Sequence, residues 1–321
     1  IKYSYKERGK MEQKGMITDY YSSEQEATGQ IEGYMEKTVI VIETAVRLAE
    51  ELSSSAIILS GDLCFEEVKT NIPIYHAFSD QKELIDHLIF SGGGKGVRTF
   101  TDKMINQSYH KLEELENIAA IEHVLGNISE GTVVGIIGSI DSCAIVVHDL
   151  KENEMVKKIR ECEERVSSDV VRAVLTICFD VATKGREGKK VGTALIVGDA
   201  EEVMQRSHPL IINPYLGQTP EDSNILEEHN WESVKELAQL DGVFVISEDG
   251  RIHAAGRYLD VDARDINIDK GLGGRHVSAA AITRDTVAVA FTVSESGGVV
   301  RIYIDGKELI CIDKPQRCIP A

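Results

Sequence analysis

Short apolar runs alternate with segments of helical periodicity in the first half of the chain, and this alternation constrains the fold most. The segment VIVIETAVRLAEEL has helical spacing at Val46, Leu48, Ala49 and Leu52. The strand-like runs AIILSG and IPIYHAF follow, and then the helical QKELIDHLI. Strands that alternate with helices are typical of a parallel sheet with helices on its faces. We therefore predict an α/β fold, with a mainly parallel sheet in an N-terminal domain over residues 37–155.

The second half of the chain mixes helices with hairpins. The segment EMVKKIRECEERVSSDVVRAVLTICFDVAT predicts one or two amphipathic helices, and Ser167 or Ser168 is placed to cap the second. Later strand-like runs meet at Asp-Gly turn signals, at residues 249–250 and 305–306. These features predict a second domain over residues 160–315, with a mixed sheet flanked by helices.

The chain is acidic, with 53 Asp and Glu residues against 35 Lys and Arg residues and a formal charge of −18. An acidic surface repels polyanions, which argues against nucleic acid as a partner. No apolar run approaches the roughly 18 residues of a membrane span, and the polar residues 1–36 lack a signal-peptide core. We expect these first residues to form a flexible arm and the protein to be cytoplasmic, with no membrane partner.

Neither the cysteines nor the glycine-rich basic segments match a metal or phosphate-loop pattern. The six cysteines form no C-x-x-C pair, and Cys143 and Cys178 lie in apolar runs, which is typical of small core residues. The segments SGGGKGVRTF and TKGREGKKVGT lack the first glycine of a phosphate loop, because Ile89 and Thr183 occupy that position. We interpret both segments as solvated loops.

An acidic residue and a glycine, Asp241 and Gly242, stand between the helical WESVKELAQL and the strand-like VFVIS. A carboxylate at such a junction can hold a divalent cation near a substrate phosphate, and the glycine lets a substrate approach the backbone. Asp-Gly pairs are usually turns, so the pair taken alone leaves a simple turn open as the alternative.

The stretch GLGGRHVSAAAITRDT combines a bared backbone with a helix of small side chains. The backbone is freed by three glycines, Gly271, Gly273 and Gly274. Arg275 and His276 then fall at a predicted helix start, whose unpaired N–H groups and dipole attract anions. Arg275 can bind two phosphate oxygens at once, and His276 can donate to a phosphate or ligate a metal. Ser278 is placed to cap the helix or to contact a phosphate.

Taken in order, these residues resemble the diadenylate cyclase (DAC) domain, whose hallmarks are a DGA and an RHR motif. The matching residues are Asp241-Gly242-Val243, GRYL ending at Leu259, Gly274-Arg275-His276 and Ser294-Glu295. The resemblance covers residues 165–310. It implies that two ATP molecules are condensed to cyclic di-AMP and two pyrophosphates, with Mg²⁺ or Mn²⁺ as cofactor.

The resemblance also implies a role for each matching residue. Asp241 would help to hold the metal and to activate the ribose 3′-hydroxyl, Gly242 would line the nucleotide, and Leu259 would pack on adenine. The phosphates would be held by Gly274, Arg275, His276 and Ser278, and the phosphate and metal side would be completed by Ser294 and Glu295. The implied catalytic residues are Asp241, Arg275 and His276, and the implied metal ligands are Asp241, His276 and Glu295.

Two positions depart from the motifs. Val243 replaces the alanine of DGA, which is a small apolar change in an expected strand. Val277 replaces the second arginine of RHR, and Gly274 stands where threonine is frequent. The loss of an arginine weakens phosphate neutralisation unless another basic side chain compensates for it. The candidates are Arg257, Arg264 and Arg301.

The resemblance further implies a homo-oligomer. Because each ATP is both attacker and target, two sites must face each other across a two-fold axis, so the active form is at least a dimer. We recognise no DNA-binding helix-hairpin-helix extension after the candidate domain and no membrane helices before it, so we expect an arrangement similar to the soluble archaeal-type branch, in which an N-terminal α/β domain comes first. The segment VIETAVRLAEELSSSAIILSG is similar to the C-terminal domain of pyruvate kinase, for which we expect a role in assembly or regulation.

Two alternatives remain open from the sequence. In the first, the chain is a sensor that binds ATP or a cyclic dinucleotide without turnover, which is motivated by the arginine missing at Val277. In the second, the α/β half is the functional part and binds a small phosphorylated effector, and the C-terminal half is an assembly module.

Overall fold

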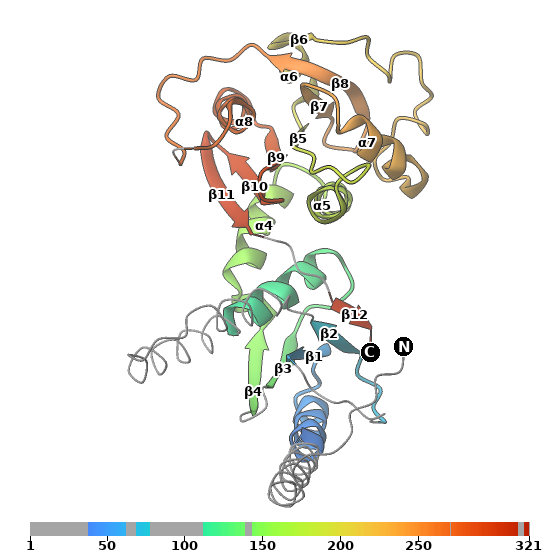
Figure 1. Cartoon of the computed structure of the whole chain (residues 1–321), viewed down its shortest axis with the longest axis vertical. Coiled ribbons are helices and arrows are strands. Elements are labelled where there is room, and N and C mark those ends of the chain that lie inside the picture. The colour runs from blue at the N-terminus through green and yellow to red at the C-terminus, as the bar shows by residue number, and fades with distance from the viewer. Residues whose placement is uncertain are drawn as a thin grey trace, which may run out of the picture.

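The computed structural model describes residues 38–61, 69–77, 112–138, 143–269, 271–313 and 318–320. Within these residues the chain forms a five-stranded and a seven-stranded sheet, which follow each other along the long axis of the molecule (Figure 1). The predicted α/β class, with a sheet in each half of the chain, is therefore confirmed. The predicted helix QKELIDHLI and the predicted arm at residues 1–36 lie outside the described residues.

The first sheet has the strand order β12-β2-β1-β3-β4. The strands are β1 (Ala56–Gly61), β2 (Ile74–Ala77), β3 (Thr132–Gly138), β4 (Cys143–Asp149) and β12 (Cys318–Pro320). The three central strands are parallel, as predicted, whereas β4 and β12 add antiparallel edges. Residues 139–142 are too few for the crossover that a parallel strand needs, so β4 returns as the second strand of a hairpin.

The edge strand β12 comes from the other end of the chain. Ile319 is in register with His76 of β2, so the polypeptide returns to its first sheet after completing its second (Figure 1). This strand was not predicted from the sequence, because three residues are too few to show a period.

Helices cover both faces of the first sheet. Helical residues 38–51 pack Ile42, Ala45 and Ala49 against one face, and helical residues 112–124 pack against the other. The helical spacing was predicted to include Leu52, but this residue follows the last helical residue and is 44% exposed.

The second sheet has the strand order β11-β10-β9-β5-β7-β8-β6 and is mixed, as predicted. Its strands are β5 (Thr193–Val197), β6 (Ser207–Pro209), β7 (Val243–Ile246), β8 (Ile252–Leu259), β9 (Val289–Val293), β10 (Val300–Ile304) and β11 (Lys307–Ile312). The pair β5 and β7 is parallel, and the other pairs are antiparallel. Both predicted hairpins form; at the second, Asp305 and Gly306 have φ of 51° and 77°, which suits a two-residue turn.

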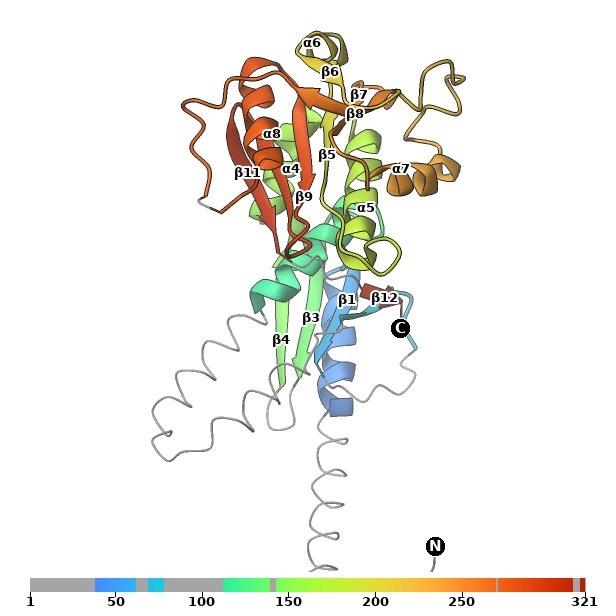
Figure 2. The ribbon, with the colours of Figure 1, turned by 45° about the horizontal axis from the view of Figure 1, so that its top comes forward.

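Helices α5 (Ser168–Lys184) and α8 (Gly274–Asp285) pack on opposite faces of this sheet (Figure 2). Alternate strand residues explain this: Leu195 and Phe291 pack with α5, whereas Ala194 and Ala290 pack with α8. The alanines of α8 are fully buried, so the helix lies close to the sheet. The shorter helices are α4 (Glu154–Glu163), α6 (Ala200–Gln205) and α7 (Trp231–Leu237), with 3₁₀ turns η1 (Leu150–Glu152) and η2 (Glu228–Asn230).

The predicted amphipathic segment forms two helices, α4 and α5. Ser167 is the N-cap residue of α5, as predicted, but its side chain makes no capping hydrogen bond. Asn153 caps α4 instead, because its side chain accepts from the N–H groups of Met155 and Val156. Cys178 is fully buried as predicted, and Cys143 is half-buried beside the core of the first sheet. Across the part of the chain that is described, every helix is too short or too polar to cross a membrane.

Candidate active site

Four segments of the chain meet where strands β5 and β7 of the second sheet begin. Because β5 and β7 are parallel, the residues that precede them, Gly192 and Asp241, lie at the same end of the strands. Strand β9 is antiparallel to β5, and Val293 is in register with Thr193, so Glu295, which follows β9, lies at this end too. The N-terminal end of α8 brings Arg275 to the same place, as its contacts show.

Arg275 joins two of these segments. Its Nη1 donates a hydrogen bond of 2.6 Å to the carbonyl of Gly192, and its Nη2 lies 3.9 Å from Oδ1 of Asp241. The Asp241 side chain is 95% exposed, and that of Arg275 is 29% exposed. The carboxylate and the guanidinium therefore share one open space, although the residues are far apart in the sequence. An exposed pair at this distance is weak, so both groups are available to a ligand.

Gly192 permits this close approach. A Cβ atom at this position would lie 3.0 Å from Nη1 of Arg275 and 3.1 Å from Cβ of Glu295. Gly192 was not predicted as a site residue, although a glycine directly before a buried strand is a signal for a close backbone contact. Glu295 is exposed and lies in the turn between β9 and β10, where the N–H of Ser294 donates to the carbonyl of Val299 over 2.9 Å. Ser294 therefore shapes this turn beside the site.

The start of α8 is bare. Gly273 is its N-cap residue, no side chain caps the helix, and a Cβ atom at Gly273 or Gly274 would meet nothing within 4 Å. The described fold therefore has room for side chains at both positions, and packing does not explain the glycines. The predicted Ser278 cap is wrong: Ser278 lies beyond the first turn, and its hydroxyl donates to the carbonyl of Arg275 over 3.1 Å.

Gly242 is required by the neighbouring strand. Its φ is +99°, and a Cβ atom would lie 2.6 Å from the backbone nitrogen of Arg257 in β8. The residue is a glycine because β7 and β8 approach each other here, whether or not a nucleotide also lies against it.

His276 points into the protein. It is 6% exposed, and its Nδ1 lies 3.0 Å from the Thr292 hydroxyl and 3.2 Å from the Tyr303 hydroxyl. Burial, together with the positive charges of Arg301 and Arg275, lowers the pKa of His276 to about 4, so the imidazole is neutral at neutral pH. These contacts fix the first turn of α8 on β9 and β10. The phosphate and metal roles of His276 stay predictions.

Leu259 is also buried, at 4% exposed, and packs with the α8 alanines. It presents no open face in this structure, so its contact with adenine stays a prediction. Its neighbour Tyr258 is 55% exposed.

The predicted metal ligands do not form a ready-made metal centre. Among the described residues, no three His, Cys, Asp or Glu side chains come close enough to hold a metal ion. The reason at this site is that His276 turns inward, towards Thr292 and Tyr303. Asp241 and Glu295 remain as exposed carboxylates, which are the hard oxygen ligands that Mg²⁺ and Mn²⁺ prefer. Because Mg²⁺ commonly takes one or two carboxylates plus substrate phosphates, these residues fit a metal that arrives with a nucleotide.

The structure separates the three arginines that we considered as substitutes for the missing one. The Nε of Arg257 donates to the Ser207 hydroxyl over 2.7 Å, and its Nη2 donates to the Met204 carbonyl over 2.9 Å, so this side chain links β8 to β6 and α6. Arg264 pairs with Asp262 on an exposed loop. Arg301 lies in β10 beside His276, where its charge helps to lower the His276 pKa, and its Nε is 3.0 Å from Oε2 of Glu308.

Comparisons with known proteins match both halves of the chain. Residues 40–151 match the family model described as "Probable sensor domain DacZ_A", and residues 180–308 match the model described as "DisA bacterial checkpoint controller nucleotide-binding", the DAC model. The second range contains all of the site residues above. Our prediction that the first segment resembles pyruvate kinase stays a prediction, because the model that matches it has a different description.

Curated relatives and a solved structure were also found. A diadenylate cyclase of Methanocaldococcus jannaschii is 38% identical over 177 residues, which cover 53% of this chain and 54% of the relative. A diadenylate cyclase of Haloferax volcanii is 43% identical over 151 residues, which cover 46% of this chain and 54% of the relative. The chain thus spans about half the length of the curated relatives that it matches. The crystal structure of DacA from Staphylococcus aureus aligns with 24% identity and a TM-score of 0.31, over 43% of this chain and 83% of that one.

Proposed function

We propose that this chain is a diadenylate cyclase, which condenses two ATP molecules into cyclic di-AMP and two pyrophosphates. The observation that carries the proposal is the convergence of Asp241 and Arg275 beside the bare start of α8, with 3.9 Å between their charged groups. The names of the two curated relatives and the DAC match over residues 180–308 support it.

The start of α8 supplies the phosphate side of the proposed site. Its free N–H groups point away from the helix, and the helix dipole favours a negative charge there. Arg275 adds a guanidinium that is only lightly engaged with Asp241. Since the chain as a whole carries a charge of −18, this local positive potential decides whether ATP binds.

The reaction makes two phosphodiester bonds. The 3′-oxygen of each ATP attacks the α-phosphorus of the other, the bond from that phosphorus to the oxygen bridging to the β-phosphorus breaks, and pyrophosphate leaves. In this proposal Asp241 faces the ribose 3′-hydroxyl, whose proton is lost in the attack, and Arg275 neutralises the phosphates. Mg²⁺ or Mn²⁺, when bound, would make the hydroxyl more acidic and offset charge on the leaving pyrophosphate. Positioning supplies much of the rest of the rate.

Such a reaction needs two copies of the site. One chain carries one Asp241 and one Arg275, so each protomer contributes one ATP, and two protomers face each other across a two-fold axis. We therefore propose a homo-oligomer that is at least a dimer, with ATP as substrate and cyclic di-AMP as product.

Arg301 is our candidate for the charge that Val277 does not provide. Of the three arginines considered, it is the one whose charge acts on His276 in the first turn of α8. Arg301 also pairs with Glu308, but it is in register with Thr292, which contacts His276, whereas the contacts of Arg257 and Arg264 lie elsewhere.

The proposal is tested by incubating the protein with ATP and either Mn²⁺ or Mg²⁺ and detecting cyclic di-AMP by mass spectrometry. We expect product from the wild type, and a loss of at least about a hundredfold in Asp241→Asn and Arg275→Ala. Arg264→Ala, which removes an exposed arginine away from the site, is the matched control and should retain wild-type turnover. A folded wild-type protein that makes no product with either metal contradicts the function, and wild-type turnover in both site variants contradicts the site.

A sensor without turnover is the second candidate, and Val277 is the observation that favours it. It requires ATP to bind, as measured by calorimetry, without release of pyrophosphate. Product formation by the wild type rules it out.

A further inference from the structure

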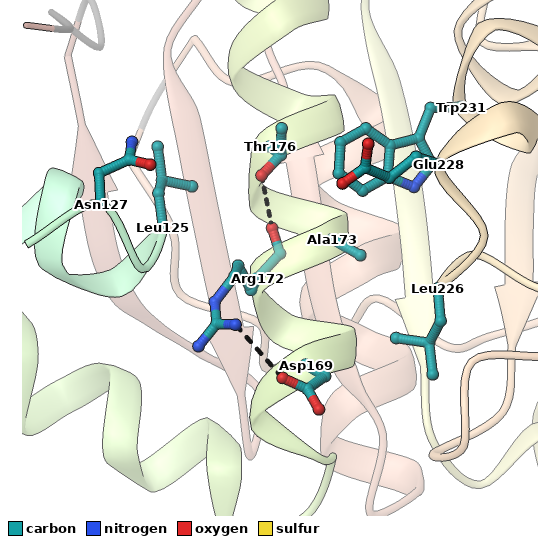
Figure 3. A pocket seen from close by; sticks show the side chains of 9 residues that line it. All are labelled: Leu125, Asn127, Asp169, Arg172, Ala173, Thr176, Leu226, Glu228 and Trp231. Carbon is teal, nitrogen blue, oxygen red and sulfur yellow. Dashed lines mark hydrogen bonds and ion pairs between the residues drawn. The ribbon is translucent and has the colours of Figure 1, made fainter. Parts of the chain in front are cut away.

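A cavity lies away from the candidate active site, between the two halves of the chain. It has a volume of about 430 Å³ and is lined by Leu125, Asn127, Asp169, Arg172, Ala173, Thr176, Leu226, Glu228 and Trp231 (Figure 3). This volume is within the range of small-molecule sites. Helix α5, which forms its floor, covers the face of the second sheet opposite α8, so the cavity is separate from the nucleotide site.

The walls of the cavity come from both matched segments. Leu125 and Asn127 belong to the segment that matches the sensor model, and Leu226, Glu228 and Trp231 belong to the segment that matches the DAC model. Figure 3 shows the first two side chains on one side of α5 and the other three on the opposite side, with Ala173 between. A ligand in this cavity would therefore contact both halves of the chain.

The polar side chains that line the cavity differ in whether they already have a hydrogen-bond or ion-pair partner. Nη1 of Arg172 lies 3.3 Å from Oδ1 of Asp169, so this guanidinium already has a carboxylate partner one turn away on α5. The amide nitrogen of Asn127 donates to Glu122 over 2.5 Å. Glu228 is exposed, and within the described part of the chain its side chain makes no hydrogen bond or ion pair. The lining therefore has one free carboxylate and a net negative charge.

Trp231 adds an aromatic face beside that carboxylate. Its indole nitrogen already donates to the carbonyl of Ile225 over 2.6 Å, so the ring contributes its carbon face and no further hydrogen bond. An aromatic face attracts a cation, and a nearby carboxylate adds to this attraction. An anion would have to displace Asp169 from Arg172 and would meet a chain of charge −18.

We propose that this cavity binds a small organic cation, with Trp231 and Glu228 as its recognition groups. The binding does not depend on the proposed cyclase reaction. A consequence for synthesis does rest on that function: α5 leads from the cavity to Gly192, whose carbonyl holds Arg275. An occupant is therefore connected to the active site through one helix and the loop that follows it.

The chain offers its own reporter for this binding, because Trp231 is its single tryptophan. The protein, without nucleotide, is titrated with choline chloride while tryptophan fluorescence is recorded at constant ionic strength. We expect a saturable change with a dissociation constant on the order of 1 mM. The uncharged isostere of choline, in which carbon replaces the nitrogen, separates the effect of charge from that of shape.

Two variants with the same change in charge make the test specific. Glu228→Gln removes the free carboxylate and should weaken choline binding about fivefold or more, whereas Glu227→Gln, one residue away and outside the cavity lining, should leave it unchanged. Thermal stabilisation of the protein by choline provides a second readout.

Each result has one meaning. A wild-type protein that shows neither a saturable fluorescence change nor thermal stabilisation overturns the proposal. An equal response to the uncharged isostere, or equal weakening in both variants, overturns the assignment of a cation to Glu228. Cyclic di-AMP synthesis is measured separately, so a failure here does not affect the proposed function.

Discussion

Glycine has two distinct roles around the candidate active site. At Gly242 the adjacent strand leaves no space for a side chain, whereas at Gly273 and Gly274 the surroundings are empty. The first is explained by the fold. The second is not, and we attribute it to a ligand that approaches the backbone at the start of α8.

We predict that Gly274→Ala leaves stability unchanged or raises it by up to about 1 kcal/mol, because alanine favours a helix. The added methyl group should lower ATP affinity and cyclic di-AMP synthesis about tenfold, since it occupies the proposed phosphate side. Chemical denaturation and the mass-spectrometric assay measure the two effects. Gly242→Ala is the contrasting variant, and we expect it to lose about 2 kcal/mol or more through its clash with β8. A Gly274→Ala protein with normal stability and normal activity would show that no ligand uses this space.

The buried His276 predicts a dependence of stability on pH. Its pKa is about 4 in the folded protein and near the ordinary 6.5 in the unfolded chain, so the unfolded state binds more protons between these values. The stability contributed by the neutral imidazole is therefore complete above pH 6.5 and is lost as the pH falls towards 4. We expect about 2 kcal/mol to be lost from His276 between pH 7 and pH 5.

This loss is measured as the difference between the wild type and His276→Gln, whose amide does not titrate in this range. Unfolding free energies from denaturant titrations at both pH values give the comparison. The same decrease in both proteins would show that His276 is not the group responsible.

At the scale of the elements, strong periodicity or Asp-Gly turns made the structure predictable. The helices α5 and α7 and the hairpins β7–β8 and β10–β11 form where their sequences indicate. The edge strand β12 was missed because its partner among the described strands, β2, is more than half of the chain away. The convergence of Asp241 with Arg275 was expected from the motifs. The hydrogen bond from Arg275 to the Gly192 carbonyl was not, because the position of Gly192 depends on the register of β5 against β9, which no local pattern encodes.

The position of Arg301 in β10 gives a prediction that separates it from the other arginines. We expect Arg301→Met to lower ATP turnover about tenfold or more, because positive charge is lost beside the start of α8. Arg264→Met makes the same change on an exposed loop and should have little effect. Arg257→Met should lose about 1–3 kcal/mol of stability, since the Met204 carbonyl and the Ser207 hydroxyl lose their partner.

These three variants are compared by initial rates of cyclic di-AMP formation and by thermal unfolding. If Arg301→Met and Arg264→Met are equally active, Arg301 does not replace the missing arginine.

At the scale of the whole molecule, the two halves are joined by a shared core and by a strand. Ile121, within the helical residues 112–124, and Leu125, directly after them, pack in the same cluster as α5. Strand β12 attaches the end of the described chain to the first sheet. The cavity of Figure 3 lies along this junction, where a ligand can act on both halves.

A fragment that begins at Asn153 tests how far the second half is independent. It retains every candidate active-site residue and α4, but it loses Ile121, Leu125 and the partner of β12. We expect some cyclic di-AMP synthesis to survive and stability to fall by about 3–6 kcal/mol, from the loss of two buried aliphatic side chains at the core. Denaturation and product assays on the fragment measure both. A fragment as stable as the full chain would contradict the shared core, and a folded fragment without synthesis would place an essential group in the first half.

The central claim is that Asp241 and Arg275 act on one nucleoside triphosphate. The most direct measurement is a crystal structure of the protein with Mn²⁺ and an ATP analogue whose 3′-hydroxyl is absent, so that the reaction cannot proceed. We predict a phosphate oxygen about 2.7–3.2 Å from the Arg275 guanidinium, with the Asp241 carboxylate facing the ribose or the metal of the same nucleotide. A triphosphate bound elsewhere on the protein, with neither side chain in reach, would contradict the claim.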